Sequence, residues 1–310
     1  MSKSWEDVRN PYLLSPKDVI LDSKGENALV VYDHFDEHYS EWTMREHYSK
    51  EAFFVRNSYN SLDLNPFWKT SIRNILGAIQ DIHEKDMIHG ALDDASSYVM
   101  RGGNTMYLIF SSQLITPKDL QALKSFLTQQ CQQPNTTNLD WKLFLKFFEL
   151  DKASAKNLRN HPVLMTDKER FNYYVAIGHY MEKRLQSSVT SVRQTMNALT
   201  YPPCGMDWRY IIVNKTHANG KKFLGYDMMN FKFQNQVISA CKYGSSLSEL
   251  NMLITNFVKH SGKYLHQSLG NQKDYMEADA AMEIGYFFPG FLSELNEMFI
   301  QYLDVHNLLD

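Results

Sequence analysis

The sequence has little cysteine and no long apolar run. The first scarcity argues against a disulfide-stabilised or zinc-binding protein, and the second argues against a membrane-spanning one. Its three cysteines, Cys131, Cys204 and Cys241, are scattered and odd in number, so they form neither a disulfide framework nor a Cys-x-x-Cys zinc site. A reducing compartment, cytoplasmic or nuclear, is therefore expected. No run approaches the ~18 apolar residues of a membrane span, and residues 1–7 lack a charged-then-apolar signal pattern. We expect a soluble chain without a membrane partner.

The short motifs of metal, cofactor and covalent chemistry are also missing. The eleven histidines show neither the His-x-Glu nor the His-Glu-x-x-His spacing of zinc sites. The chain contains no glycine-rich loop that would cradle a phosphate and no nucleophile elbow. The sequence therefore predicts no bound metal and no cofactor.

What the chain does contain is material for two folded domains. Of its 310 residues, 44% are hydrophobic and 13% aromatic, which suffices for sizeable cores. β-rich runs interrupted by turn residues predict hairpins over residues 19–32 and 98–110, with Gly102 and Gly103 at the second turn. Asn65-Pro66 predicts the start of a helix between these two hairpins.

From about residue 117 onward the apolar spacing is helical. Thr166–Glu169 and Ser246–Glu249 match the capping-box pattern of a helix start. The strand-like runs end before Asn160-His161-Pro162. We therefore predict a mainly α chain, with short β hairpins in a domain over residues 1–160 and an all-helical domain over residues 161–310.

Charge is sorted along the second domain. The stretch from Arg209 to Lys263 holds eight Lys or Arg and two acids, a balance of +6. Residues 274–310 hold eight acids and no Lys or Arg, a balance of −8. The basic stretch is a candidate surface for an anionic partner. A solvated helix face followed by an acidic terminal helix explains the same pattern without any partner.

The first domain resembles a truncated protein kinase. Ile82–Leu92 resembles the approach to the His-Arg-Asp catalytic loop, and Ala28–Glu41 resembles the strand and hinge that join the two kinase lobes. The resemblance places Ala91 where the catalytic base would be and Ser96 where a metal-binding Asn would be. It places Phe110-Ser111-Ser112 at the metal-binding Asp-Phe-Gly motif.

The same resemblance implies an inactive kinase remnant. The sequence begins too late for the glycine-rich loop and its strand lysine, and only about eight residues are left for an activation segment before the next helix. We therefore expect no ATP site. His89 is expected to be structural, a partly buried imidazole that is hydrogen-bonded to the backbone.

The second domain resembles the kinase-extension nuclease (KEN) domain, which follows a kinase domain in the endoplasmic-reticulum stress sensor and in RNase L. Four features carry the resemblance: the His-Pro before a capped helix, Met206-Asp207-Trp208-Arg209, the helix over Leu250–Tyr264, and Phe287–Leu292. The resemblance implies metal-independent RNA cleavage by attack of the 2′-hydroxyl on the adjacent phosphate, carried out by dimers. That reaction needs a general base, a general acid and cations that stabilise the phosphorane.

The residues that match the catalytic helix of the family are altered. Ungapped matching places Val258 at the family's Arg, Lys259 at its Asn and Lys263 at its His, while Tyr243 resembles an upstream Tyr. A lysine with an ordinary pKa of about 10.4 is a poor general base near neutral pH but still binds phosphate. A shift of one turn could instead recruit His260 or His266. The candidate catalytic residues are Tyr243, Lys259, His260 and Lys263.

The resemblance also implies a set of RNA-binding candidates, Arg209, Lys215, His217, Lys221, Lys222 and Tyr264. For the loop over residues 215–222 an ordinary surface loop is an equal alternative, and Asp207 with Arg209 could form a structural ion pair around a core Trp208. If the site exists, Tyr243, Lys259, His260, Lys263 and His217 should converge.

Two functions follow from the sequence. The first is an RNA-binding or endoribonuclease-like KEN protein with an inactive kinase remnant. The alternative is a non-catalytic scaffold or regulatory partner that has lost both activities. The expected partners are RNA and a second chain, in a homodimer or in a heterodimer with a related kinase/KEN protein.

Overall fold

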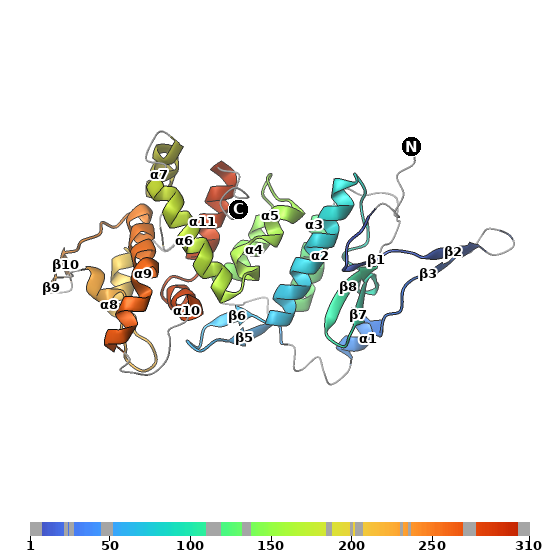
Figure 1. The fold of residues 1–310 in the computed structure, drawn as a ribbon, viewed down its shortest axis with the longest axis horizontal. Coiled ribbons are helices and arrows are strands. Elements are labelled where there is room, and N and C mark those ends of the chain that lie inside the picture. The colour runs from blue at the N-terminus through green and yellow to red at the C-terminus, as the bar shows by residue number, and fades with distance from the viewer. Residues whose placement is uncertain are drawn as a thin grey trace. The chain divides into compact units, whose positions relative to one another are not determined.

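The chain folds into two compact units in the computed structural model (Figure 1). The first unit comprises Met1–Val55 and Leu62–Leu164, and the second comprises Arg56–Ser61 and Met165–Asp310. The structure describes residues 8–21, 24, 28–44, 52–109, 119–131, 138–183, 188–198, 201, 207–229, 232–234, 237–268 and 277–302. The mainly α fold class is confirmed. The kinase-like and KEN-like identities of the two units stay predictions.

The first unit is built on a small sheet with the strand order β1-β8-β7-β4. Its strands are β1 (Leu13–Leu14), β4 (Glu37–His38), β7 (Tyr98–Arg101) and β8 (Thr105–Ile109). β7 and β8 form the hairpin predicted over residues 98–110, and Gly102 and Gly103 both adopt positive φ (65° and 76°) at its turn. β2 (Asp18–Leu21) pairs antiparallel with β3 (Ala28–Val31), so the first predicted hairpin is also confirmed.

A third hairpin, which the sequence analysis did not predict, joins β5 (Phe54–Arg56) to β6 (Leu62–Leu64).

Helix α2 (Pro66–Glu84) forms the core of the first unit. Asn65 caps it by accepting a hydrogen bond from the Phe67 N–H at 2.9 Å, and Pro66 occupies the first turn. Helical spacing buries one apolar face, formed by Trp68, Ile72, Ile75, Leu76, Ile79 and Ile82. The helix packs against β8 and α5. The other helices here are α1 (Tyr39–Thr43), α3 (Asp119–Cys131), α4 (Leu139–Phe147), α5 (Ala155–Arg159), and the 3₁₀ turns η3 (Ala95–Ser97) and η4 (Pro162–Leu164).

The second unit is a group of helices around α9 (Leu247–Ser268), which packs against α6, α7 and α10 (Figure 1). The predicted capping box at α6 is present, because Glu169 N–H donates to Thr166 Oγ1 at 3.3 Å and Thr166 N–H to Glu169 Oε2 at 2.7 Å. At α9, Glu249 N–H donates to Ser246 Oγ. The other helices are α6 (Asp167–Lys183), α7 (Ser188–Ala198), α8 (Trp208–Asn214), α10 (Glu277–Phe287), α11 (Phe291–Tyr302), and the 3₁₀ turn η5 (Tyr226–Met229).

The prediction of an all-helical second domain was wrong at one place. β9 (Lys232–Gln234) and β10 (Val237–Ala240) form an antiparallel hairpin between η5 and α9. Val237 and Ile238 are β-branched, and Phe233 is aromatic, so these runs favour strands over helix. Each run is only a few residues long, which is too short for the helical spacing of the flanking segments to reveal it.

Helices α6 and α9 approach each other very closely at Gly178. A Cβ added there would lie 2.4 Å from Thr255 Cγ2 and 2.9 Å from Thr255 Oγ1. Only a residue without a side chain therefore fits between the two helices without displacing Thr255. On the core side of α9, Leu250, Leu253, Ile254 and Phe257 are fully buried.

Among the helices of the described ranges, none combines the length and the apolar character that crossing a lipid bilayer requires.

Replacing Gly178 tests this close approach. We expect Gly178→Ala to lower the free energy of unfolding by about 1–3 kcal/mol, because the clash with Thr255 outweighs the better helix propensity of alanine. Urea unfolding followed by tryptophan fluorescence measures the change. Gly285→Ala in α10 is the matched control, since nothing lies within 4 Å of its new Cβ. This control should be neutral or stabilising by up to about 1 kcal/mol, and equal destabilisation of both variants would refute a tight contact at Gly178.

Candidate nucleic-acid interface

The loop that resembles a kinase catalytic loop is a packed structural element. His89 is fully buried, its Nε2 donates to the Ile109 carbonyl at 2.5 Å, and its Nδ1 accepts from Ala91 N–H at 3.3 Å. Burial lowers the pKa of His89, which favours this neutral imidazole. The structural role predicted for His89 is confirmed, with burial that is complete rather than partial.

Asp119, at the start of α3, holds the same loop in place. Its buried carboxylate accepts the backbone N–H groups of His89 and Gly90, both at 2.9 Å, and lies 3.0 Å from His83 Nε2. Burial alone would raise the pKa of Asp119, but the hydrogen bonds from His83, Gly90 and His89 bring it below its ordinary value. The carboxylate is therefore occupied within the fold.

Of the two positions that the kinase resemblance assigns to metal ligands, the structure describes only Ser96. Ser96 lies in η3, where its N–H donates to Asp94 Oδ1 at 2.8 Å. Phe110-Ser111-Ser112, at the predicted Asp-Phe-Gly position, lies outside the described residues. Within the described ranges, no group of three His, Cys, Asp or Glu side chains is arranged to hold a metal ion.

In the second unit, Asp207 and Arg209 form a structural ion pair beside Trp208. Arg209 Nε lies 2.9 Å and its Nη2 2.5 Å from Asp207 Oδ2, and this hydrogen bonding raises the pKa of Arg209. Asp207 also caps α8 by accepting Arg209 N–H at 3.0 Å. Trp208 is fully buried and its Nε1 donates to the Ser246 carbonyl. The structural interpretation of this motif is confirmed, and Arg209, a predicted RNA-binding residue, already has its charge compensated.

Tyr243, a predicted catalytic residue, is buried against α9. Its side chain is only 2% exposed, and its hydroxyl accepts a hydrogen bond from Asn256 Nδ2 at 3.0 Å. The Lys242 ammonium lies 5.5 Å from the Tyr243 ring centroid. Arg209 Nη1 reaches the Tyr243 carbonyl at 3.5 Å. The sequence analysis missed Asn256, the hydrogen-bond partner of Tyr243.

Helix α9 divides the positions that were matched to a KEN catalytic helix between core and solvent. Val258, which the KEN resemblance aligns with an arginine, is 3% exposed and lies in the core. Lys259 and His260 are exposed. They follow Asn256 by three and four residues, so all three share one side of the helix. We call Lys259 and His260, together with the exposed Lys242 that precedes the helix beside Tyr243, the α9 basic face.

Lys263 and Tyr264 belong to the last turns of α9. The side chains of both residues lie outside the described part of the chain. The catalytic role predicted for Lys263 and the RNA-binding role predicted for Tyr264 therefore stay predictions.

The predicted RNA-binding residues of the loop over 215–222 are mostly engaged within the unit. Lys215 Nζ donates to the Tyr286 carbonyl and lies 4.2 Å from the Tyr286 ring centroid, and burial lowers its pKa. Lys222 Nζ donates to the Val213 carbonyl. The Lys221 side chain is exposed, while its backbone N–H donates to Asn219 Oδ1.

His217 belongs to a cluster centred on Glu283 of α10. Its Nε2 lies 3.0 Å from Glu283 Oε2, and its ring stacks on Tyr286 at a centroid distance of 4.9 Å. Glu283 is 1% exposed and also accepts Leu224 N–H at 3.0 Å and a hydrogen bond from the Tyr59 side chain. Burial raises the pKa of Glu283, and the contacts with His217, Leu224 and Tyr59 oppose that rise.

Glu283 was missed as an individual residue because it counted only as one acid of an acidic segment. Its spacing from Ala280, Ile284 and Phe287 on the buried face of α10 is the signal that could have found it. The structure therefore brings Tyr243, Asn256 and the α9 basic face together through α9. His217 is engaged in the Glu283 cluster, and its convergence with Tyr243 stays a prediction.

A comparison with protein-family models finds no match to this sequence, and a comparison with curated proteins finds no significant match.

Removing the Glu283 carboxylate tests the cluster. We expect Glu283→Ala to lower the free energy of unfolding by about 3–5 kcal/mol, because His217 and the Leu224 N–H lose their shared acceptor in a buried site. Thermal and urea unfolding measure the change. Glu277→Ala, in the exposed first turn of the same helix, should cost less than about 1 kcal/mol. Similar destabilisation of both variants would contradict a structural role for Glu283.

Proposed function

We propose that this chain is a pseudokinase joined to a KEN-like domain, and that the second unit binds RNA without cleaving it. One observation carries the proposal, namely the division of α9. The exposed side of this helix carries Lys259 and His260, while the position that matches the family's arginine carries a buried valine, Val258. The unit therefore has an exposed lysine and an exposed imidazole that can bind phosphate, but an altered set of groups for catalysis.

RNA binding and RNA cleavage place different demands on the residues of α9. Replacing the matched Arg, Asn and His therefore permits binding but removes cleavage. Affinity for a phosphate backbone needs exposed positive charge, which lysines supply without demanding geometry. Transesterification in addition needs a positioned base, acid and phosphorane-stabilising cation. The Tyr243 hydroxyl is bonded to Asn256 and Arg209 is paired with Asp207, so both groups are already engaged within the unit.

RNA binding is tested by fluorescence anisotropy with a labelled single-stranded RNA at several salt concentrations. We expect Lys242→Ala and Lys259→Ala each to weaken binding about threefold to tenfold. Each substitution should also reduce the slope of log affinity against log salt by about 0.7 for every phosphate that the lysine neutralises. Lys168→Ala, which removes an exposed lysine of α6 with a side chain 73% accessible, is the matched control and should leave both quantities unchanged. RNA affinity that is absent at low salt, or that falls equally in the control, would refute the proposal.

Cleavage is tested with the same protein, a stem-loop RNA and EDTA. We expect the RNA to stay intact. Metal-independent cleavage that disappears in His260→Ala or Tyr243→Phe would overturn the non-cleaving part of the proposal and favour the endoribonuclease.

A second function, a non-catalytic scaffold, is favoured by a different observation in the first unit. The β2–β3 hairpin exposes four apolar side chains, Val19 (44%), Ile20 (51%), Val30 (37%) and Val31 (36%). An apolar two-stranded ribbon is a template for pairing with another chain.

The scaffold function predicts self-association or pairing with a related kinase/KEN chain. Sedimentation velocity over a range of protein concentrations measures the association. We expect Ile20→Lys to shift any dimer toward monomer, while Ile88→Lys, at a separate site 37% exposed, should not. A strictly monomeric wild-type chain that captures no related chain would exclude this function.

A further inference from the structure

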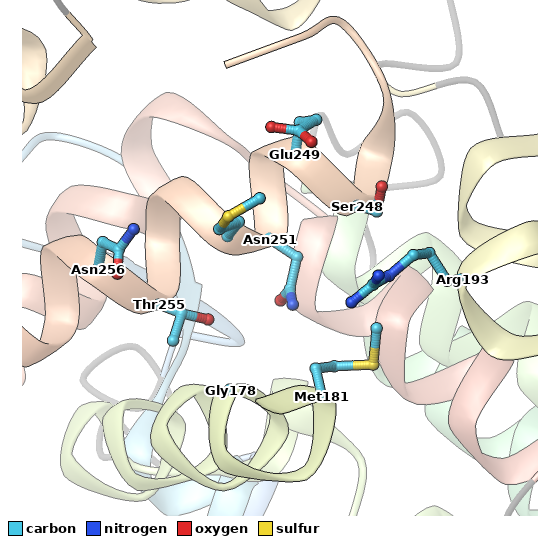
Figure 2. A pocket seen from close by; sticks show the side chains of 9 residues that line it. Gly178, Met181, Arg193, Ser248, Glu249, Asn251, Thr255 and Asn256 are labelled. Carbon is cyan, nitrogen blue, oxygen red and sulfur yellow. The ribbon is translucent and has the colours of Figure 1, made fainter. Parts of the chain in front are cut away.

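A pocket of about 400 Å³ lies between α6, α7 and α9 in the second unit (Figure 2). Its volume falls in the range of small-molecule sites, roughly 300–1,000 Å³. α9 contributes most of its walls, and α6 and α7 contribute the rest. The lining residues are Gly178, Met181, Arg193, Ser248, Glu249, Asn251, Met252, Thr255 and Asn256.

Two polar side chains of this pocket are more than nine-tenths buried. Asn251 is 4% and Thr255 6% exposed. Among the described residues, none supplies a hydrogen-bond partner to the Asn251 carboxamide or the Thr255 hydroxyl. Figure 2 shows the Asn251 carboxamide and the Arg193 guanidinium pointing toward each other above Met181. Neither residue is among those whose polar side-chain atoms are both inaccessible and without a partner, so these polar atoms are open to the pocket, where a ligand can hydrogen-bond to them.

The chemistry of the lining matches a nucleobase. A carboxamide such as that of Asn251 presents a donor and an acceptor side by side, which is the pattern that pairs with the edge of a base. The thioethers of Met181 and Met252 are polarisable and adapt to the face and edge of an aromatic ring. Arg193 is exposed, and its guanidinium suits a phosphate. The Glu249 carboxylate repels a second phosphate and can accept a hydrogen bond from an exocyclic amino group of a base.

The pocket adjoins the α9 basic face. Asn256 lines the pocket and donates to Tyr243, and His260 follows Asn256 by one helical turn. A strand whose phosphates lie along Lys259 and His260 could therefore turn one base toward α6 and α7.

We propose that this pocket receives one unstacked base of a single-stranded RNA, with Asn251 reading the edge of the base and Arg193 binding its phosphate. The inference rests on the proposed RNA-binding function. It assigns the selectivity of RNA binding to recognition of one base. The same side chains would also bind a free nucleoside monophosphate, so the experiment compares a free nucleotide with an RNA strand.

The experiment measures binding of AMP by isothermal titration and of a short single-stranded RNA by anisotropy, with the full chain. We expect Asn251→Leu to weaken both at least tenfold without lowering the melting temperature, because an unpartnered buried amide is replaced by an apolar group of similar shape. Asn172→Leu, at an exposed position of α6, is the matched control and should bind like the wild type. Arg193→Met should weaken AMP more than adenosine, since only AMP carries the phosphate.

The outcomes separate this inference from the function on which it rests. RNA binding that Asn251→Leu leaves unchanged, without AMP binding, would overturn the pocket assignment and leave RNA binding by the basic face intact. AMP binding that depends on Asn251, with no RNA binding, would overturn the RNA source and the proposed function together, and would assign the pocket to a free nucleotide. Loss of fold in Asn251→Leu, seen as a lowered melting temperature, would show that Asn251 is structural and would overturn its assigned role.

Discussion

The contact between Gly178 and Thr255 determines how near α6 lies to α9, and the candidate sites of the second unit depend on that distance. Thr255 and Asn256 are neighbours on α9, so the closest point of the two helices also positions the side chain that bonds Tyr243. Asn251 lies one turn earlier on the same helix and lines the pocket beside this contact. A bulkier residue at position 178 would separate the helices and change the pocket and the Tyr243 environment together.

Both units use a buried carboxylate to hold a loop against a helix. In the first unit, Asp119 binds two backbone N–H groups and His83, and in the second, Glu283 binds His217 and the Leu224 N–H. Burying a carboxylate is unfavourable unless hydrogen bonds and opposite charge compensate it. These groups therefore determine loop conformation, and each engages a histidine, of which His217 was a predicted RNA-binding residue. The same holds for Arg209, whose guanidinium is compensated by Asp207.

Much of the local structure could be predicted because it depends on neighbouring residues. Asn65-Pro66 begins α2, Gly102 and Gly103 make the β7–β8 turn, and Thr166 with Glu169 caps α6. The β9–β10 hairpin was missed because its runs are short and lie among helical segments. Of the candidate site, the sequence named Tyr243, Lys259 and His260, and their joint catalytic role stays a prediction. It missed Asn256 and Glu283, whose roles depend on partners 13 and 66 residues away.

The sequence by itself determined the mainly α class, the helix and hairpin starts, and the separation of a basic stretch from an acidic one. These properties follow from periodicity, capping and composition, which are local. Only the tertiary structure decided which charges face solvent. Lys215 is half-buried and binds a carbonyl group, and Val258 lies in the core. Lys222 also binds a carbonyl group but is exposed, as are Lys259 and His260. The physical reason is that burial and pairing are set by contacts between helices far apart in the chain, and no local pattern encodes those contacts.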